Sequence, residues 1–297
     1  MDHLHRSLRN TFATGRVDRA AGRRRDPAWL AAREQDERSQ FIPMWRSQNL
    51  FLGPDGPRPV LLSPQQVRAL IPESKSSTFL GIRAGRAYFA VDLPPDGPAA
   101  SRLADLGEFQ DLRQLAALLD SETGGLLAYA RAMTYWHTQH RFCGVCGSPT
   151  FSTEGGHARV CSNSRCAEHH FPRTDPAVIV LVRCEERALL GRKPLWHEGL
   201  YSTVAGFVEP GESIEIAVAR EVWEETGVEI AETHYHSSQP WPFPSSLMLA
   251  FTARATSHSI QVNDDELEHA RWFTREEVHD GLTSGSLRLP APVPSPR

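Results

Sequence analysis

Hydrophobic residues in the first 125 positions fall into short blocks separated by segments rich in proline and glycine. The blocks RPVLL, STFLGI and RAYFAVDL are typical of short strands, and GPDGPRP and PPDGPAA mark turns beside them. A helical pattern starts near residue 108, and a second helical stretch lies near 125–139. The pattern predicts a small α+β unit with no internal repeat and no chemistry of its own.

The pattern changes beyond Pro172 and Pro176, which mark a boundary. PAVIVLV and ALLGRK predict a buried strand and a shorter partner strand, and SLMLAFTARAT and ARWFTREEV predict further elements later on. Between them, Ser213 is a plausible helix N-cap and Gly227 a plausible stop, so residues 214–226 can form one helix.

Composition narrows the function classes. The chain has 297 residues, 40% of them hydrophobic, and a formal net charge of −4, which argues against bulk electrostatic binding to nucleic acid. The basic segment GRVDRAAGRRRDPAWL contains the run Arg23–Arg25 but is interrupted by Asp18 and Asp26, so a solvated tail or loop is the favoured interpretation. The segment MDHLHRSLRN has no apolar region, and the longest aliphatic run, AVIVLV, is too short to span a bilayer. We expect a cytoplasmic protein.

Four of the five cysteines cluster in one segment, as C-x2-C and C-x4-C pairs with fourteen residues between them. Two thiolate pairs on turns, joined by a hairpin with Gly155 and Gly156 at its tip, can converge into one tetrahedral site. Because four protein thiolates leave no open position, the expected Zn²⁺ is structural. The nearby His157 and His169 are spare ligands that we do not favour. The predicted zinc ligands are Cys143, Cys146, Cys161 and Cys166.

The predicted helix 214–226 carries Glu221, Glu224 and Glu225 at i, i+3 and i+4, on one side of the helix. Three carboxylates so close together repel one another unless cations neutralise them, and oxygen ligands suit Mg²⁺ or Mn²⁺. Arg220 could pair with Glu212 or a neighbouring carboxylate and fix the preceding loop. On EVWEE alone, a solvated acidic helix face would be the usual explanation.

The longer frame from Gly206 to Val228 fits G-x5-E-x7-R-E-U-x-E-E-x-G-U at every specified position, where U is a bulky aliphatic residue. It resembles the signature of the Nudix hydrolases, which implies an α/β/α sandwich and hydrolysis of a nucleoside diphosphate linked to another group. By this resemblance Glu221 and Glu225 are metal ligands, Glu224 is a ligand or orients water, and the Ala205 carbonyl is a further ligand.

Residues 238–246 read SQPWPFPSS, with Trp241 and Phe243 between three prolines. The residue before each proline is held extended, so the segment should be stiff and should lie at a sheet edge or in a loop. A core-filling turn is the competing interpretation. The segment matches the SQPWPFPxS array of the NADH pyrophosphatase branch of the Nudix family, which also carries a four-cysteine zinc ribbon just upstream.

This resemblance is close over about 140–275 and general over the first 125 residues. It divides the chain into an N-terminal α+β domain (1–139), a zinc ribbon (140–171) and a Nudix domain (172–297). DDELEHARWF matches a downstream acidic segment, which makes Glu266 a metal ligand or candidate base, with Asp265 and Glu268 as alternatives. The resemblance implies a substrate-binding set of Phe171, Phe207, Gln239, Pro240, Trp241, Pro242, Phe243, Pro244, Ser245 and Ser246.

The expected reaction is the Mg²⁺- or Mn²⁺-dependent cleavage of NADH or NAD⁺ into nicotinamide mononucleotide and AMP, in a homodimer. Two alternatives are the same cleavage on an NAD cap at the 5′ end of RNA, and an RNA-binding zinc-ribbon protein with a passive Nudix domain. The chain departs from the family at SLRLPAPVPSPR, where four prolines forbid the usual final helix.

Overall fold

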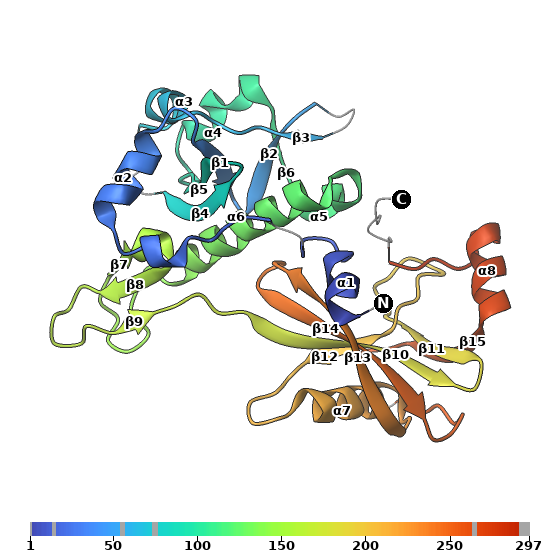
Figure 1. Cartoon of the computed structure of the whole chain (residues 1–297). Coiled ribbons are helices and arrows are strands. Elements are labelled where there is room, and N and C mark those ends of the chain that lie inside the picture. The colour runs from blue at the N-terminus through green and yellow to red at the C-terminus, as the bar shows by residue number, and fades with distance from the viewer. Residues whose placement is uncertain (1, 14–15, 54–56, 73–76, 263–265, 291–297) are drawn as a thin grey trace. The chain divides into compact units, whose positions relative to one another are not determined.

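The structure is a computed structural model that describes residues 2–13, 16–53, 57–72, 77–262 and 266–290 (Figure 1). By internal contacts the chain divides into two units that do not follow chain order. Among the described residues, the first unit takes those up to 13, 175–240 and 246–290. The second unit takes those from 16 through 174 together with the loop Trp241–Ser245. Asp265 and the prolines beyond Pro290 lie outside the described residues.

The first unit contains the predicted strand pair and the predicted glutamate helix, which are both confirmed. Ser213 caps that helix, and Gly227 ends it with φ +65°. The elements of this unit are α1 (His3–Leu8), β10 (Asp175–Cys184), β11 (Arg187–Arg192), β12 (Val204–Phe207), α7 (Ile214–Thr226), β13 (Ile230–Trp241), β14 (Ser246–Ala255), β15 (His269–Thr274) and α8 (Arg275–Ser284).

The sheet of the first unit has the order β13-β14-β10-β11-β15, with β12 paired to β10. Adjacent residues of a strand face opposite sides of a sheet. Leu189 of β11 packs in a cluster with Val218 of α7, whereas Leu190 packs with Phe273 and with Val278 of α8. The two helices therefore cover opposite faces, which gives the α/β/α layers that the sequence predicts.

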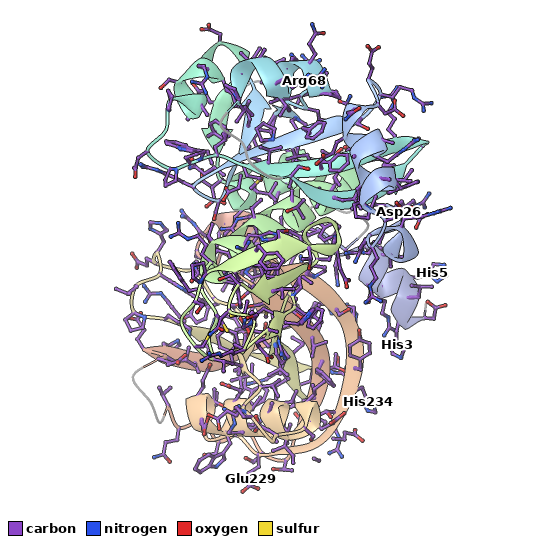
Figure 2. All side chains as sticks on the ribbon, turned by 90° about the vertical axis from the view of Figure 1, so that its left-hand side faces the viewer. His3, His5, Asp26, Arg68, Glu229 and His234 are labelled. Carbon is purple, nitrogen blue, oxygen red and sulfur yellow. The ribbon has the colours of Figure 1, made fainter. Side chains whose placement is uncertain are left out.

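The N-terminal segment packs against β13, the edge strand of this sheet. The side-chain amide of Asn10 donates to Ser237 Oγ at 3.1 Å and to the Ser238 carbonyl at 2.9 Å. The ring of His3, which Figure 2 labels on α1, lies 5.2 Å from the ring of Tyr235. Through these contacts the N-terminal segment covers the edge strand β13, which lies more than 220 positions later in the sequence.

The second unit combines a mixed sheet with a small three-stranded sheet, β7-β8-β9. Short 3-10 turns lie at Ala21–Arg23, Ala104–Leu106, Ala116–Leu118 and Glu154–Gly156. The other elements are α2 (Pro27–Gln35), β1 (Gln40–Trp45), β2 (Gln48–Leu52), β3 (Arg58–Pro59), α3 (Pro64–Leu70), β4 (Thr78–Arg83), β5 (Arg86–Asp92), α4 (Ala99–Arg102), β6 (Glu108–Gln110), α5 (Leu112–Leu115), α6 (Ser121–Gln139), β7 (Thr150–Thr153), β8 (Ala158–Cys161) and β9 (His169–His170).

The helical pattern predicted from residue 108 is wrong for its first three residues. Residues 108–110 form β6, which pairs with β2, and the helix starts only after Asp111, whose carboxylate accepts from the Arg113 amide. The long helix predicted near 125–139 begins earlier, at Ser121, because the Asp120 carboxylate caps the Thr123 amide at 2.9 Å. Capping residues thus decide both helix starts.

The larger sheet of the second unit repeats the topology of the first. Its order, read from the opposite edge, is β4-β5-β1-β2, with β6 and β3 both paired to β2. In the second unit β1 is parallel to β5 and antiparallel to β2. In the first unit β10 is likewise parallel to β14 and antiparallel to β11. A bridge between Phe41 and Leu62 also joins β1 to the residues after β3, as β12 joins β10.

The repeat is not visible in the sequence because different side chains form the shared topology. The helix in the place of α7 is α3, a seven-residue segment PQQVRAL that has no glutamate. The second unit therefore keeps the sheet of the first without its carboxylates.

The described residues include no helix that combines the length and apolarity needed to cross a bilayer.

Candidate active site and zinc centre

The four clustered cysteines meet in the second unit, as predicted. Their sulfur atoms all lie within 4.8 Å of one another, with 3.8 Å between Cys143 and Cys166 and 3.4 Å between Cys146 and Cys161. A tetrahedral shell with Zn–S bonds of about 2.3 Å has edges of about 3.8 Å. The predicted hairpin is present, because β7 and β8 are joined by a turn at Glu154–Gly156. The donor set fits a closed, structural Zn²⁺ site.

The two spare histidines are engaged elsewhere. His157 Nε2 lies 2.7 Å from the Phe79 carbonyl oxygen, and burial lowers the pKa of this histidine to about 4, so the neutral ring donates to that carbonyl. The ring of His169 stacks on Phe171, with 6.3 Å between centroids. Both residues have structural contacts that account for their positions.

The apolar face of α7 packs against the sheet and thereby sets the direction of the acidic face. Ala217, Val218 and Val222 are fully buried, and each buried valine contributes about 1.5–3 kcal/mol relative to an exposed one. Burial of this stripe fixes which way the glutamates point. Glu225 is itself 3% exposed, which is unusual for a carboxylate.

Arg220 forms hydrogen bonds with three carboxylates, one in the loop before this helix and two on the helix itself. Its guanidinium donates to both oxygens of Glu212, at 2.8 and 2.9 Å, and to one oxygen each of Glu221 and Glu224, both at 2.9 Å. It also donates to the Phe207 carbonyl at 2.8 Å. The bond from Arg220, with a second from the Glu209 amide, lowers the pKa of Glu212 to about 2. The predicted role of Arg220 in fixing the preceding loop is confirmed.

Glu221 packs directly on the backbone of β12. A Cβ built on Gly206 would lie 2.0 Å from the Glu221 carboxyl carbon, so only glycine leaves room for this carboxylate. Ala205, whose carbonyl is a predicted ligand, is the preceding residue of β12 and pairs with Ile179 of β10. The glycine that opens the motif is therefore explained by the carboxylate fifteen residues later.

Electrostatic repulsion is built into this cluster. Burial raises the pKa of Glu221, Arg220 opposes the rise, and the charges of Glu224 and Glu266 add to it. Glu266 thus lies within electrostatic reach of α7, and its carboxylate also pairs with Lys193 at 2.6 Å. Among the described residues the four cysteines are the one group of three or more side chains placed to share a metal ion as the structure stands. Glu221 is largely buried and Glu225 is fully buried, whereas Glu224 and Glu266 are exposed. Like charges so close together, two of them removed from solvent, fit a site that takes a cation.

Lys193 and Arg192 are charged neighbours that the sequence analysis did not identify. Arg192 pairs with Glu268, one of the alternatives to Glu266, and Lys193 pairs with Glu266 itself. Both cations lie in GRK at the end of β11, which pairs with β15 just after the acidic segment. Only the register of β11 with β15 brings these charges together, so no local sequence pattern indicates the pairs.

The SQPWPFPSS segment lies at a sheet edge and in the turn that follows, as predicted. Gln239 and Pro240 lie near the end of β13, and Ser246 begins β14, where it is buried and is the register partner of Asp175. The Gln239 side-chain amide donates to the Thr11 carbonyl at 3.2 Å, which is a structural contact. Trp241 is the last residue of β13, and the turn comprises Pro242, Phe243, Pro244 and Ser245.

Trp241 and Phe243 pack edge to face, with 5.1 Å and 68° between their rings. Both side chains are half-buried, and among the described residues neither belongs to the main apolar cluster of the first sheet or of the larger sheet of the second unit. This arrangement disfavours the interpretation of a core plug. The other two predicted aromatic positions, Phe171 in the second unit and Phe207 in the first, are 50% and 58% exposed. Their rings are available for contact with a flat ligand.

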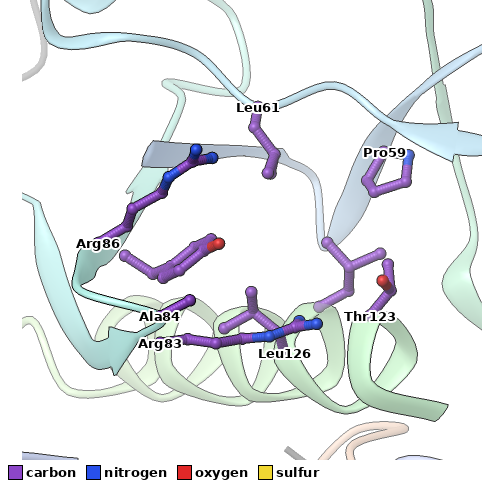
Figure 3. A pocket seen from close by; sticks show the side chains of 9 residues that line it. Pro59, Leu61, Arg83, Ala84, Arg86, Thr123 and Leu126 are labelled. Atoms are coloured by element: carbon purple, nitrogen blue, oxygen red, sulfur yellow. The ribbon is translucent and has the colours of Figure 1, made fainter. Parts of the chain in front are cut away.

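A separate cavity of about 350 Å³ lies in the second unit, between the β4–β5 turn and the start of α6 (Figure 3). Arg83, Arg86 and Tyr88 line it together with the apolar side chains of Leu126 and Leu127. Arg83 also pairs with a carboxylate of α6 at 2.5 Å. No acidic residue lines this cavity among the described residues, so it lacks the groups for metal-dependent hydrolysis.

Three family models match successive parts of the chain. Residues 30–136 match the NADH pyrophosphatase-like rudimentary NUDIX domain, residues 139–171 the NADH pyrophosphatase zinc ribbon domain, and residues 173–290 the NUDIX domain. The rudimentary domain agrees with the repeated sheet topology, and the ribbon agrees with the four-cysteine cluster.

Three relatives extend this finding. Nudix hydrolase 19, chloroplastic, of Arabidopsis thaliana is 43% identical, over 68% of this chain and 49% of its own length. NAD-capped RNA hydrolase NudC of Stutzerimonas stutzeri is 46% identical, over 62% of this chain and 64% of its own length. NAD-capped RNA hydrolase NUDT12 of Macaca fascicularis is 34% identical, over 93% of this chain and 68% of its own length. The chain thus spans about half of the Arabidopsis relative and under two thirds of the Stutzerimonas relative. With the matched models and the glutamate cluster on Gly206, these similarities show that the chain belongs to the Nudix hydrolases, in the NADH pyrophosphatase (NAD-capped RNA hydrolase) family.

Proposed function

We propose that this protein hydrolyses the diphosphate bond of NADH or NAD⁺ and releases nicotinamide mononucleotide and AMP. The reaction adds one water across the P–O–P bridge, so each product keeps one phosphate. The observation that carries the proposal is the packing of the Glu221 carboxylate on Gly206, beside the buried Glu225 and within electrostatic reach of Glu266.

The proposed metal ligands are Glu221, Glu225, Glu266 and the Ala205 carbonyl, with Mg²⁺ or Mn²⁺ as the cation. A bound divalent ion supplies positive charge at the diphosphate and acidifies water. Glu224 is the proposed ligand or water-orienting group, and Glu266 is a candidate base. Arg220 donates hydrogen bonds to Glu221, to Glu224 and to the Phe207 carbonyl. These bonds connect α7 to the end of β12 and fix the positions of the two carboxylates.

The proposed dinucleotide-binding groups are the SQPWPFPSS segment, Phe171 and Phe207. Flat rings recognise nicotinamide and adenine by stacking, and alternate prolines keep the rings of Trp241 and Phe243 in place. The half-buried packing of these two side chains supports this role, because each keeps part of its surface in solvent.

A second candidate is removal of the NAD cap from RNA by the same cleavage. The names of the Stutzerimonas and Macaca relatives support it, and the chemistry at the diphosphate would be unchanged. A passive RNA reader of a different class is disfavoured, since a binder has no need of the buried Glu225. Salt separates these functions, because RNA bound through several phosphates loses affinity steeply with salt.

A homodimer and a cytoplasmic location remain predictions, as does the choice between Mg²⁺ and Mn²⁺. Sedimentation at micromolar concentration tests the first of these.

The deciding experiment measures kcat/KM for NADH, NAD⁺, ADP-ribose, a diadenosine polyphosphate and NAD-capped RNA, with each metal. We expect AMP and reduced nicotinamide mononucleotide in equal amounts from NADH, AMP and the oxidised mononucleotide from NAD⁺, and no turnover after the metal is chelated. Turnover that survives chelation, or products other than two monophosphates, would contradict the proposal.

A further inference from the structure

The loop Trp241–Ser245 belongs to the same unit as α6, so contacts between them are internal to that unit. Arg131, in the middle of α6, places its guanidinium carbon 4.6 Å from the centroid of the Phe243 ring. Its Nη1 also donates to the Pro242 carbonyl. Arg113 of α5 lies 5.8 Å from the centroid of the Trp241 ring. Each aromatic side chain of the loop therefore faces one guanidinium.

Arg131 has no carboxylate within ion-pairing distance among the described residues. Burial lowers the pKa of Arg131, while the charge of Asp111 opposes this from a greater distance. A half-buried guanidinium is costly unless the surroundings interact with it. The ring of Phe243 and the carbonyl of Pro242 supply that interaction, and both belong to the SQPWPFPSS segment.

We propose that Arg131 is a positioning residue for the dinucleotide-binding loop. It fixes the plane of Phe243 by stacking, and it fixes the backbone at Pro242 by a hydrogen bond. Because Trp241 packs edge to face on Phe243, the same contact sets the orientation of both rings. The proposal deepens the proposed function and rests on it, since the loop is taken to recognise the nicotinamide half of the substrate.

The geometry needs arginine at this position. A planar guanidinium can stack on a ring and donate sideways to a carbonyl at the same time, whereas a lysine ammonium is a point charge. Arg131→Met keeps most of the length and removes the charge and the donors. Arg131→Lys keeps the charge over the ring and loses the planar fork. Arg68→Met on α3 is the matched control, because Arg68 is exposed and lies at the surface of the same unit (Figure 2).

The kinetic test compares NADH with ADP-ribose, which shares the diphosphate and lacks nicotinamide. For Arg131→Met we expect KM for NADH to rise on the order of ten-fold, with kcat within about two-fold and ADP-ribose little affected. Arg131→Lys should fall between this variant and the wild type, and Arg68→Met should match the wild type. An equal loss of kcat/KM for both substrates would overturn the proposal, because it indicates general damage to the fold.

A substrate-free measurement separates this proposal from the proposed function. The Phe243 amide donates to the Trp241 carbonyl at 2.8 Å, so its hydrogen exchange reports on the order of the loop. Arg131→Met should speed this exchange on the order of ten-fold, and Arg68→Met should leave it unchanged. An unchanged rate in Arg131→Met overturns the positioning role whatever the substrate is. If the rate rises while the wild type fails to cleave NADH, the proposed function is at fault and the loop contact stands.

Discussion

The carboxylate of Glu221 occupies the space that any side chain at position 206 would need. The ideal Cβ position of Gly206 lies 2.1 Å from each Glu221 carboxylate oxygen, well inside the contact distance of the two atoms. Glycine at this point is therefore a requirement of the site's geometry, and the strand backbone serves as the surface on which Glu221 rests.

Gly206→Ala tests this relationship. The added methyl must displace the Glu221 carboxylate, so we expect kcat for NADH to fall on the order of 10². Gly22→Ala is the control, because a Cβ there meets nothing within 4 Å. Steady-state kinetics with a thermal melt checks the prediction, and near-normal kcat in folded Gly206→Ala would show that Glu221 is not held where catalysis needs it.

Glu225→Gln keeps the size of a buried side chain and removes its charge. If this carboxylate holds the divalent ion, kcat should fall on the order of 10² or more while the fold survives. Glu215→Gln, in the exposed first turn of the same helix, should leave kcat unchanged. Saturating Mg²⁺ must be used for all three proteins. Equal activity in the two variants at that concentration would contradict the assigned role.

The zinc prediction concerns stability more than chemistry. Protein purified without added zinc should contain about one equivalent, and Cys143→Ser should lose the metal and unfold at lower temperature. Cys184→Ser is the matched control, because Cys184 is a buried thiol at the end of β10 in the other unit. Metal analysis decides the question, and zinc retained in full by Cys143→Ser would exclude the four-thiolate shell.

Acid should weaken the Arg220–Glu212 contact in a defined pH window. The folded pKa of Glu212 is lowered to about 2, below its ordinary value, so the contact stabilises the protein at neutral pH. That stability is lost as the pH falls from the ordinary glutamate range through about 2. Urea unfolding of the wild type and of Glu212→Gln should therefore converge toward low pH. A constant difference between the two proteins from pH 7 to pH 3 would be the opposite result.

Trp241→Ala tests the loop directly. The metals act on the diphosphate, which NADH and ADP-ribose share, while the loop can recognise only the part in which they differ. Loss of one stacking contact costs roughly 0.5–1.5 kcal/mol beyond lost area, so we expect a several-fold loss of discrimination. The oligomeric state of the variant must match the wild type. If kcat/KM for both substrates falls by the same factor, Trp241 supports the fold and does not select the substrate.

The sequence predicted the parts of this protein in which spacing alone fixes geometry. Cys143 and Cys146 converge with the second cysteine pair because short turns leave few alternatives, and the i, i+3, i+4 spacing places three glutamates on one side of α7. The cap at Ser213 and the stop at Gly227 were likewise visible, since each rests on one residue type at one position.

Long-range contacts could not be predicted in this way. Lys193 meets Glu266 only through the register of β11 and β15, and Arg131 meets Phe243 from 112 positions earlier in the chain. The repeated topology also escaped sequence analysis, because α3 and α7 share a place in the fold and almost no side-chain chemistry. Glutamines and an arginine stand in the helix where the other unit carries its carboxylates.

The bonds between Asn10 and the strand residues Ser237 and Ser238 have a consequence for synthesis of the protein. These partners are separated by 227 and 228 positions, so the first helix leaves the ribosome long before the strand it packs against. At typical translation rates the delay is roughly 10 to 45 seconds. The whole second unit except its short loop can fold within that interval. Closure of the sheet edge by α1 is therefore among the last events in the maturation of the nascent chain.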